Sequence, residues 1–206
     1  MRPKAWHFAF AGGVTGGHIY PGLATAQQLR SLVPEVRITF LGTGRGWERS
    51  VVAEAGFDYV PIESQPLGST PGRWLRFALA HVRGGRTARR FLTRQGVDGV
   101  LGLGGYASLP ACRAALRLGL PLVLLEPNAV AGRANRHLAR RAALVCAAFP
   151  QVVAQLKAPH IEITGTPIRE VQQPGEVAAA SQGRPRRLVV LGGSQGARCF
   201  NRDVPS

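Results

Sequence analysis

Short apolar runs recur along the chain, separated by stretches in which apolar residues return with a helical period. The runs are compact and mostly aliphatic, which is typical of strands buried on both faces of a sheet. They predict strands at 6–11, 37–41, 59–62, 97–101, 122–125, 144–147, 161–164 and 188–191. The intervening segments predict one helix that begins at Pro21 and others over 48–55, 73–94 and 110–118.

Strand and helix therefore alternate over most of the chain. This order favours an α/β fold with a doubly wound parallel sheet, covered by helices on both faces. The segment 170–187 has no apolar period and is rich in Gln, Pro, Gly and Ala, which predicts a linker or a variable surface insertion. We expect one domain over 1–165. Residues 166–206 are expected to hold the linker and only the first strand, loop and helix of a second domain.

Composition adds a strong positive charge to this picture. The 206 residues include 26 basic and 11 acidic ones, a net charge of +15, and 24 of the basic residues are arginine. Residues 64–161 hold 14 of the basic residues and only two acids, Asp98 and Glu126. An anionic partner is therefore expected, and it would meet the middle of the chain.

Several protein classes are excluded at this stage. No apolar stretch approaches the roughly 18–20 residues that a membrane-spanning helix needs, and residues 1–11 lack a signal-peptide cleavage pattern. Three widely separated cysteines, Cys112, Cys146 and Cys199, suggest neither a disulfide framework nor a zinc site. We expect a cytosolic protein with reduced cysteines and without a metal or another cofactor.

The first predicted strand runs into a glycine-rich loop, GGVTGG at 12–17. Small residues before a helix let backbone amides approach an anion. The Lys and Ser/Thr of a triphosphate-binding loop are absent, as is the GxGxxG pattern of dinucleotide sites, so phosphoryl transfer and nicotinamide binding are disfavoured. A phosphate site and a purely structural turn both stay open.

His18 follows this loop directly. A neutral imidazole at the mouth of a cleft can take a proton from an attacking hydroxyl, but a capping or orienting role fits the sequence equally well. The other histidines, His7, His81, His137 and His160, have no metal-binding spacing and are expected to be structural or solvent-facing.

Two later strands also end in segments that suggest chemistry. Gly104, Gly105 and Tyr106 follow one strand and resemble a second anion site, although a structural turn fits nearly as well. Glu126 and Asn128 follow the next strand, where the carboxylate either pairs with an arginine or meets substrate hydroxyls. Ligands bind at the carboxyl ends of strands in doubly wound sheets, so these loops are expected to form one cleft.

The predicted helix at 73–94 carries seven arginines and no acid. We expect Leu75, Leu79 and Val82 to face the sheet, and Gly84 with Gly85 to interrupt the helix.

Aromatic residues of the same helix would then lie among arginines on the surface. The residues concerned are Trp74, Phe77, Arg73, Arg76 and Arg83. This mixture is typical of surfaces that bind anionic lipid headgroups. A nucleic-acid surface and a plain solvated face are the alternatives, although no nucleic-acid motif is present.

Five motifs, in order along the chain, resemble those of the MurG family of bacterial peptidoglycan glycosyltransferases. They are GGVTGGHIYPGLATA at 12–26, GLGGYASLP at 102–110, EPNAVAGRANRHLA at 126–139, GTPIR at 165–169 and GGSQGA at 192–197. The family transfers N-acetylglucosamine from UDP-N-acetylglucosamine to the muramyl 4-hydroxyl of undecaprenyl-pyrophosphoryl-N-acetylmuramyl-pentapeptide (lipid I). Its members have two Rossmann-like domains of the GT-B kind. The resemblance implies an N-terminal acceptor- and membrane-binding domain at 1–165 and an incomplete donor-binding domain after it.

The resemblance also implies roles for individual residues. The catalytic candidates are His18 and Glu126. Donor contacts would come from Thr15, Gly16, Gly17, Asn128, Arg169, Ser194, Gln195 and Gly196. The acceptor pyrophosphate would lie against Gly13, Thr15, Gly16, Gly104, Gly105 and Tyr106. The implied partners are UDP-N-acetylglucosamine, lipid I and the anionic cytoplasmic face of the bacterial inner membrane, with neither a metal nor nucleic acid.

The sequence departs from the family at three positions. Leu125, Pro127 and Thr166 stand where the family usually has His, Gln and Asn. The family's uridine- and sugar-binding segments follow the GGSQGA motif, so we expect this chain alone to hold the donor poorly. Two other hypotheses stay open. One is another GT-B enzyme with a different nucleotide sugar or lipid acceptor, and the other is a module that binds lipid or pyrophosphate without catalysis.

Overall fold

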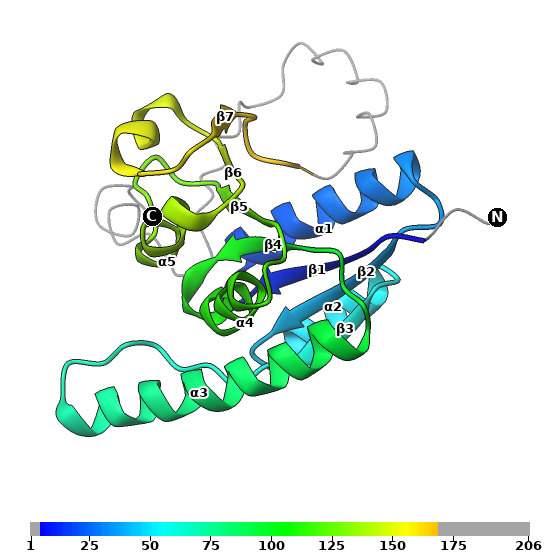
Figure 1. Cartoon of the computed structure of the whole chain (residues 1–206). Coiled ribbons are helices and arrows are strands. Elements are labelled where there is room, and N and C mark those ends of the chain that lie inside the picture. The colour runs from blue at the N-terminus through cyan, green and yellow to red at the C-terminus, as the bar shows by residue number, and fades with distance from the viewer. Residues whose placement is uncertain (1–4, 169–206) are drawn as a thin grey trace, which may run out of the picture. The chain divides into compact units, whose positions relative to one another are not determined.

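The computed structural model describes residues 5–168, in which seven parallel strands form one sheet (Figure 1). The strand order is β3-β2-β1-β4-β5-β6-β7. The strands are β1 (His7–Gly12), β2 (Arg37–Gly42), β3 (Asp58–Pro61), β4 (Gly99–Gly104), β5 (Leu122–Glu126), β6 (Leu144–Ala147) and β7 (Ile161–Ile163). The predicted α/β class with a doubly wound parallel sheet is confirmed. The strand expected at 188–191 lies outside the described residues.

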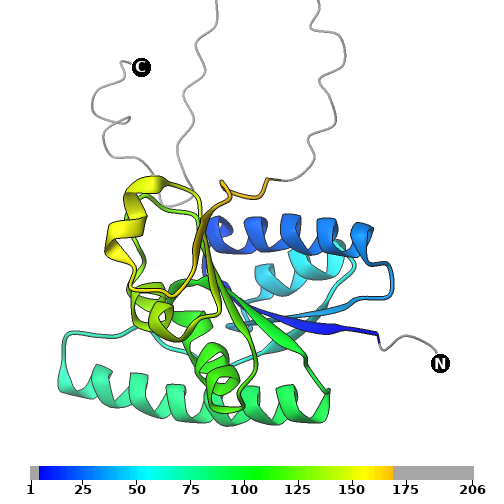
Figure 2. The ribbon, with the colours of Figure 1, turned by 45° about the horizontal axis from the view of Figure 1, so that its top comes forward.

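Helices cover both faces of the sheet (Figure 2). They are α1 (Gly16–Leu32), α2 (Gly46–Glu54), α3 (Pro71–Arg94), α4 (Gly105–Arg117) and α5 (Arg133–Leu138), with short 3₁₀ turns at Ala139–Arg141 and Pro150–Gln155. One core packs α1 and α2 on the sheet through Ile19, Leu23, Phe40 and Val52. The other packs α3, α4 and α5 on the opposite face through Leu92, Ala111, Leu122 and Leu138. The sheet is therefore buried on both sides, as its continuous apolar strands require.

The helices after the two glycine-rich loops begin earlier than predicted. α1 begins at Gly16 and α4 at Gly105, so Pro21 and Pro110 lie inside their helices rather than at the start. A proline there gives up one backbone hydrogen bond of the helix. The prediction failed because it used proline as a start signal, whereas glycines of the loops form the first helical turns. First-turn amides, which lack acceptors within the helix, consequently lie directly at the loops.

Helix α3 is continuous, so Gly84 and Gly85 do not interrupt it. Its buried residues are Ala80, Gly84, Ala88 and Leu92, which recur every four positions. Gly84 lies so close to the carbonyl oxygen of Glu63 that a Cβ atom would overlap it. Small residues therefore let the helix approach the chain beneath it.

The aliphatic stripe of α3 does not face the sheet, contrary to prediction. Leu75, Leu79 and Val82 are 61%, 47% and 50% exposed, and Trp74 is 58% exposed. The contact face is occupied by the smaller residues instead, because they permit a closer approach than leucine would. The larger apolar side chains are left on the surface.

His7, which was expected to be structural or solvent-facing, and Cys112 are both packed in the interior. His7 is 2% exposed, and its ring lies 3.0 Å from Thr39 Oγ1 and 3.2 Å from the Gln95 carbonyl oxygen. Burial lowers the pKa of His7. Cys112 is fully buried, which raises the pKa of its thiol to about 12, whereas Cys199 lies outside the described residues. Within 5–168 no group of His, Cys, Asp or Glu is arranged to hold a metal, and no helix is long and apolar enough to cross a membrane.

The neighbouring glycines of α3 provide a matched test of this packing. We expect Gly84→Ala to lower the free energy of unfolding by about 1–3 kcal/mol, because the added methyl group must push α3 away from Glu63. Gly85→Ala is the control. The nearest atom to its Cβ would be the Pro110 carbonyl oxygen at 4.0 Å, so better helix propensity should leave stability unchanged or raise it by up to about 1 kcal/mol. Urea denaturation measures both, and equal effects of the two changes would contradict this account.

Candidate functional site

Three loops meet at the carboxyl edge of the sheet, after β1, β4 and β5. β4 pairs with β1 on one side and with β5 on the other, so the three loops are neighbours. The first loop leads into α1, the second into α4, and the third toward α5. The topology therefore brings together the glycine-rich and acidic segments that the sequence placed at strand ends.

The first loop turns sharply before α1. Gly13 has φ 155° and Val14 has φ 79°, the one positive φ found for a residue other than glycine in the described part of the chain. Thr15 follows in an extended conformation, and its carbonyl oxygen accepts hydrogen bonds from the amides of His18 and Ile19. The amides at the start of α1 then face the loop. A helix N-terminus of this kind carries a partial positive charge that favours anions.

The second loop is a left-handed turn made by two glycines. Gly104 has φ 90° and Gly105 has φ 71°, a conformation that side chains disfavour. α4 begins at Gly105, so a second helix N-terminus opens at this edge. Tyr106 is half-buried in its first turn, and the Ser108 hydroxyl donates to the carbonyl oxygen of Gly105 at 2.9 Å.

His18 links the first loop to the second. Its Nδ1 lies 2.9 Å from Thr15 Oγ1. Its ring lies against the second loop, because a Cβ built on Gly104 would be 3.1 Å from His18 Cδ2 and one on Gly105 would be 3.4 Å from Cε1. A side chain at Gly104 would therefore crowd the imidazole, a second reason for glycine there, whereas a Cβ at Gly105 would only reach van der Waals contact with the ring.

The protonation state of His18 is suited to the role of a base, because a neutral imidazole can accept a proton. Burial lowers the pKa of His18, and the charge of Glu126 offsets part of that effect. The imidazole is consequently neutral at pH 7. A threonine hydroxyl can donate to Nδ1 or accept from it. When Thr15 accepts, Nδ1 carries the proton and Nε2 is the basic nitrogen.

Glu126 is buried and engaged with its own loop. It is 1% exposed, and its two oxygens accept hydrogen bonds from the backbone and side-chain amides of Asn128 at 3.1 and 3.0 Å, from the Gly132 amide at 2.8 Å and from Asn135 Nδ2 at 3.0 Å. Within residues 5–168 none of these donors is an arginine, so in that part of the chain the carboxylate is engaged by amides of its own loop and of α5. The carboxylate shapes the third loop.

Two buried polar residues of the site were missed in the sequence. Asn135 is 1% exposed and donates to the Leu125 carbonyl oxygen at 2.9 Å as well as to Glu126. It lies within the motif at 126–139, which was the available signal. Glu48 of α2 is 0% exposed beneath the first loop. No signal marked it, since a lone acid in a short amphipathic helix is usually solvated.

The expected donor-binding residues divide into two groups. Thr15, Gly16 and Gly17 lie at the start of α1, and Asn128 is exposed on the third loop. The remaining four, Arg169, Ser194, Gln195 and Gly196, lie outside the described residues.

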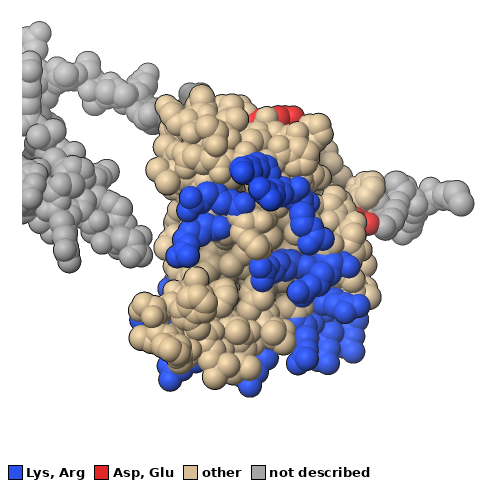
Figure 3. Space-filling view, turned by 60° about the vertical axis from the view of Figure 1, so that its left-hand side comes forward, with Lys and Arg blue, Asp and Glu red and all other residues tan. Residues whose placement is uncertain are grey.

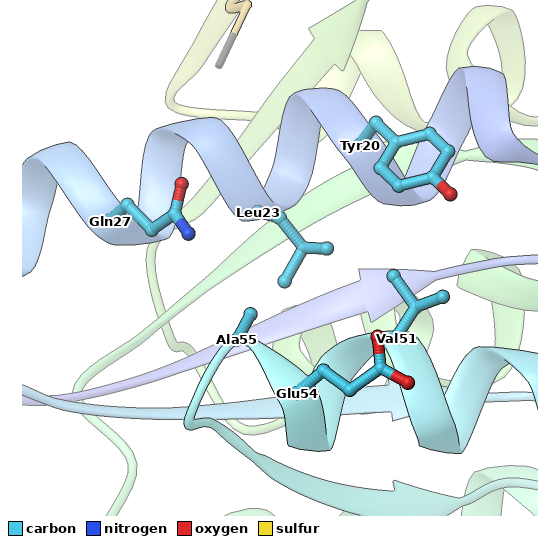
Figure 4. A pocket seen from close by; sticks show the side chains of 6 residues that line it. All are labelled: Tyr20, Leu23, Gln27, Val51, Glu54 and Ala55. Carbon is cyan, nitrogen blue, oxygen red and sulfur yellow. The ribbon is translucent and has the colours of Figure 1, made fainter. Parts of the chain in front are cut away.

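A pocket of about 340 Å³ lies between α1 and α2, apart from the predicted site residues (Figure 4). It is lined by Tyr20, Leu23, Gln27, Val51, Glu54 and Ala55. None of these residues was expected to bind a substrate.

Basic side chains gather over one broad face of the molecule (Figure 3). All seven arginines of α3 are exposed. Arg83 lies 3.8 Å from Glu63, both of them exposed, and Phe77 stacks on His81 with ring centroids 5.7 Å apart. The surface of α3 therefore combines cationic side chains with the exposed Trp74, Leu75, Leu79 and Val82.

Comparison with known proteins bears on these loops. A family model described as "Glycosyltransferase family 28 N-terminal domain" matches residues 8–147, which include all three loops. The chain is similar to proteins of Halorhodospira halophila and Clavibacter michiganensis subsp. michiganensis, at 43% identity over 205 residues and 39% over 207. Both are named UDP-N-acetylglucosamine--N-acetylmuramyl-(pentapeptide) pyrophosphoryl-undecaprenol N-acetylglucosamine transferase.

These matches cover a larger share of this chain than of its relatives. They take in 96% of this chain but 54% and 56% of those relatives, so the chain spans about half the length of the curated relatives it matches. The crystal structure of MurG from Acinetobacter baumannii superimposes with a TM-score of 0.68 at 31% identity, covering 78% of this chain and 46% of that one. The expected fold, a Rossmann-like domain that matches the N-terminal half of a GT-B enzyme, is thereby confirmed.

Proposed function

Because this chain belongs to the glycosyltransferase family 28 N-terminal domain family, we propose that it forms the acceptor-binding half of a lipid I N-acetylglucosaminyltransferase. The donor would be UDP-N-acetylglucosamine and the product lipid II. The observation that carries the proposal is the junction of two helix N-termini through His18, at neighbouring strands of the sheet. The names of the relatives supply the substrates, which are consistent with a site built for an anion.

The pyrophosphate of the acceptor fits the first and second loops. Each phosphate carries negative charge, and each of α1 and α4 offers first-turn amides and the positive end of its dipole. Glycines permit the backbone to approach the ligand, and Thr15 and Tyr106 add hydroxyl groups. We assign Gly13, Thr15, Gly16, Gly104, Gly105 and Tyr106 to this role.

The reaction would be a single inverting displacement. The muramyl 4-hydroxyl attacks the anomeric carbon of the donor, the new glycosidic C–O bond forms, and the bond to the UDP oxygen breaks. His18 is the first candidate for the base, with Nε2 taking the hydroxyl proton while Thr15 holds Nδ1. Glu126 is the weaker candidate, since four hydrogen bonds already occupy its oxygens.

The donor would be held mainly outside the described residues. Arg169, Ser194, Gln195 and Gly196 are assigned to it by resemblance, as are Asn128 and the start of α1. Leu125 is 3% exposed and packs in the core of α1 and α2, which gives it no free surface for a ligand. The departure at Leu125 therefore concerns packing more than donor contact.

The exposed surface of α3 supports peripheral binding to the cytoplasmic face of the inner membrane. Apolar side chains on a helix surface bury themselves at the boundary of headgroups and acyl chains, and arginines are attracted to anionic lipid. The exposed apolar side chains are those of Trp74, Leu75, Leu79 and Val82. The exposed arginines include Arg73, Arg76 and Arg83. A lipid-linked acceptor would be met at that surface.

Transfer is tested with the protein as its gene encodes it, using lipid I and radiolabelled UDP-N-acetylglucosamine. We expect labelled lipid II, and we expect His18→Ala to lower turnover by about 100-fold or more because the base is lost. His160→Ala, at an exposed position, is the control. Since burial lowers the pKa of His18 below its ordinary value of 6.5, the acidic fall of the rate should have its midpoint below pH 6.5, where the imidazole becomes protonated. Near-normal turnover of His18→Ala would contradict the role of base, and preference for another sugar nucleotide would favour a different GT-B enzyme.

Membrane binding is tested by sedimentation with vesicles of phosphatidylglycerol and phosphatidylcholine. The double change Arg73→Gln, Arg76→Gln should weaken binding by roughly tenfold or more, at about 1 kcal/mol for each arginine near an anionic surface. Trp74→Ala should also weaken binding, whereas Leu32→Ala, which is 71% exposed at the end of α1, is the control and should not. Equal binding of all variants, or tight binding to nucleic acid without binding to vesicles, would contradict the proposal.

A further inference from the structure

Glu48 is a buried carboxylate that the proposed reaction does not use. It lies on α2, is 0% exposed and accepts four hydrogen bonds from neutral donors. Oε1 accepts from the Val14 amide at 2.7 Å and the Thr43 hydroxyl at 2.8 Å. Oε2 accepts from the Thr43 amide at 2.9 Å and the Tyr59 hydroxyl at 2.6 Å. A buried carboxylate without hydrogen bonds would be strongly unfavourable. The four donors therefore compensate for the burial of Glu48.

The surrounding chain leaves room for this carboxylate. A Cβ atom on Gly13 would lie 2.8 Å from Oε1, and one on Gly42 would lie 2.7 Å from Oε2. Tyr59 is fixed in turn, since its oxygen accepts from the Gly44 amide at 2.8 Å. Burial raises the pKa of Tyr59 and the hydrogen bond to Glu48 raises it further, so the phenol stays a donor. Glu48 thus connects the loops after β1 and β2 with β3.

Val14 is the residue that needs this support. Its φ of 79° lies in the left-handed region, which β-branched residues rarely adopt. Its amide donates to Glu48, and its carbonyl oxygen accepts from Arg45 Nη1 at 3.4 Å. Glu48 lies in α2, and Arg45 is the N-cap residue of the same helix. The unusual turn is therefore held from α2, two residues before α1 begins at Gly16.

We propose that Glu48 is a positioning residue for the first glycine-rich loop. By accepting the Val14 amide it holds the left-handed turn, and the turn aims the amides of Thr15, Gly16 and Gly17 at the acceptor pyrophosphate. This inference rests on the proposed function. Glu48 acts through the loop, touches no substrate, and removes the Val14 amide from the anion site.

The test separates positioning from charge. Glu48→Gln keeps the shape of the side chain but must turn its NH₂ group toward either the Val14 or the Thr43 amide, and it offers only a neutral acceptor to the other. Loss of a negative charge near an anion site would by itself strengthen anion binding. A positioning role predicts the opposite sign, weaker binding.

The ligand probe is inorganic pyrophosphate, and the readout is the backbone amide NMR shifts of Thr15, Gly16 and Gly17 in this chain. We expect Glu48→Gln to weaken binding at these amides by tenfold or more. Tyr59→Phe is the matched control, because it removes one donor from the same carboxylate but leaves the bond to Val14. It should lower the unfolding midpoint and change the affinity less than twofold. If Glu48→Gln does not fold, Glu48→Asp, which keeps the charge but withdraws it from Val14, replaces it with the same expected result.

A rescue variant distinguishes the turn from general stability. Glycine adopts a φ of 79° without steric cost, so Val14→Gly added to Glu48→Gln should restore most of the lost affinity. Unchanged or stronger binding by folded Glu48→Gln would overturn the inference, as would an equal loss in Tyr59→Phe.

Hydrogen exchange of the Val14 amide tests its hydrogen bond to Glu48 without any ligand. Exchange should accelerate at least tenfold in Glu48→Gln and stay unchanged in Tyr59→Phe. If pyrophosphate shifts none of the three amides in the unmodified chain, the proposed acceptor site is contradicted. Faster exchange of the Val14 amide in Glu48→Gln would even then support the positioning of the loop by Glu48. Unchanged exchange of the Val14 amide in Glu48→Gln would overturn the positioning role of Glu48, whatever the result with pyrophosphate.

Discussion

The close packing of the His18 ring on Gly104 and Gly105 sets the geometry of the whole site. It requires that β1 and β4 be neighbours, so that the helix after one strand meets the turn after the other. It requires glycine at both turn positions because of their positive φ, and at Gly104 also because a Cβ would crowd the imidazole. The result is two helix N-termini on opposite faces of one sheet that open at the same edge, with a neutral histidine between them.

Two buried carboxylates stabilise the loops around this contact in the same way. Glu48 and Glu126 each accept four hydrogen bonds, and in each case a backbone amide of the adjacent loop is among the donors. A carboxylate accepts hydrogen bonds at two oxygens and its charge strengthens each of them, whereas a neutral amide side chain accepts at one oxygen only. These two acids thus stabilise the loops from the interior, whereas all seven arginines of α3 are exposed on the surface.

Much of this could be predicted from the sequence, and the failures have physical causes. Apolar runs and strand-end glycines predicted the sheet and the loops, because burial on both faces and positive φ leave clear marks. Helix starts were wrong since Pro21 and Pro110 lie inside their helices. The face of α3 was wrong because the contact uses Ala80, Gly84 and Ala88, whose small size carries no apolar signal. Glu48 was missed because its partners come from three segments that only the fold brings together.

The central claim is that the first two loops together bind the acceptor's pyrophosphate. The most direct test is to titrate this chain with a short-chain prenyl-pyrophosphoryl-N-acetylmuramyl-pentapeptide and to follow every assigned backbone amide by NMR. The account predicts saturable shifts at Thr15, Gly16 and Gly17 and, at the same ligand concentration, at Gly104, Gly105 and Tyr106. Shifts confined to one loop, to the surface of α3 or to the pocket between α1 and α2 would contradict it.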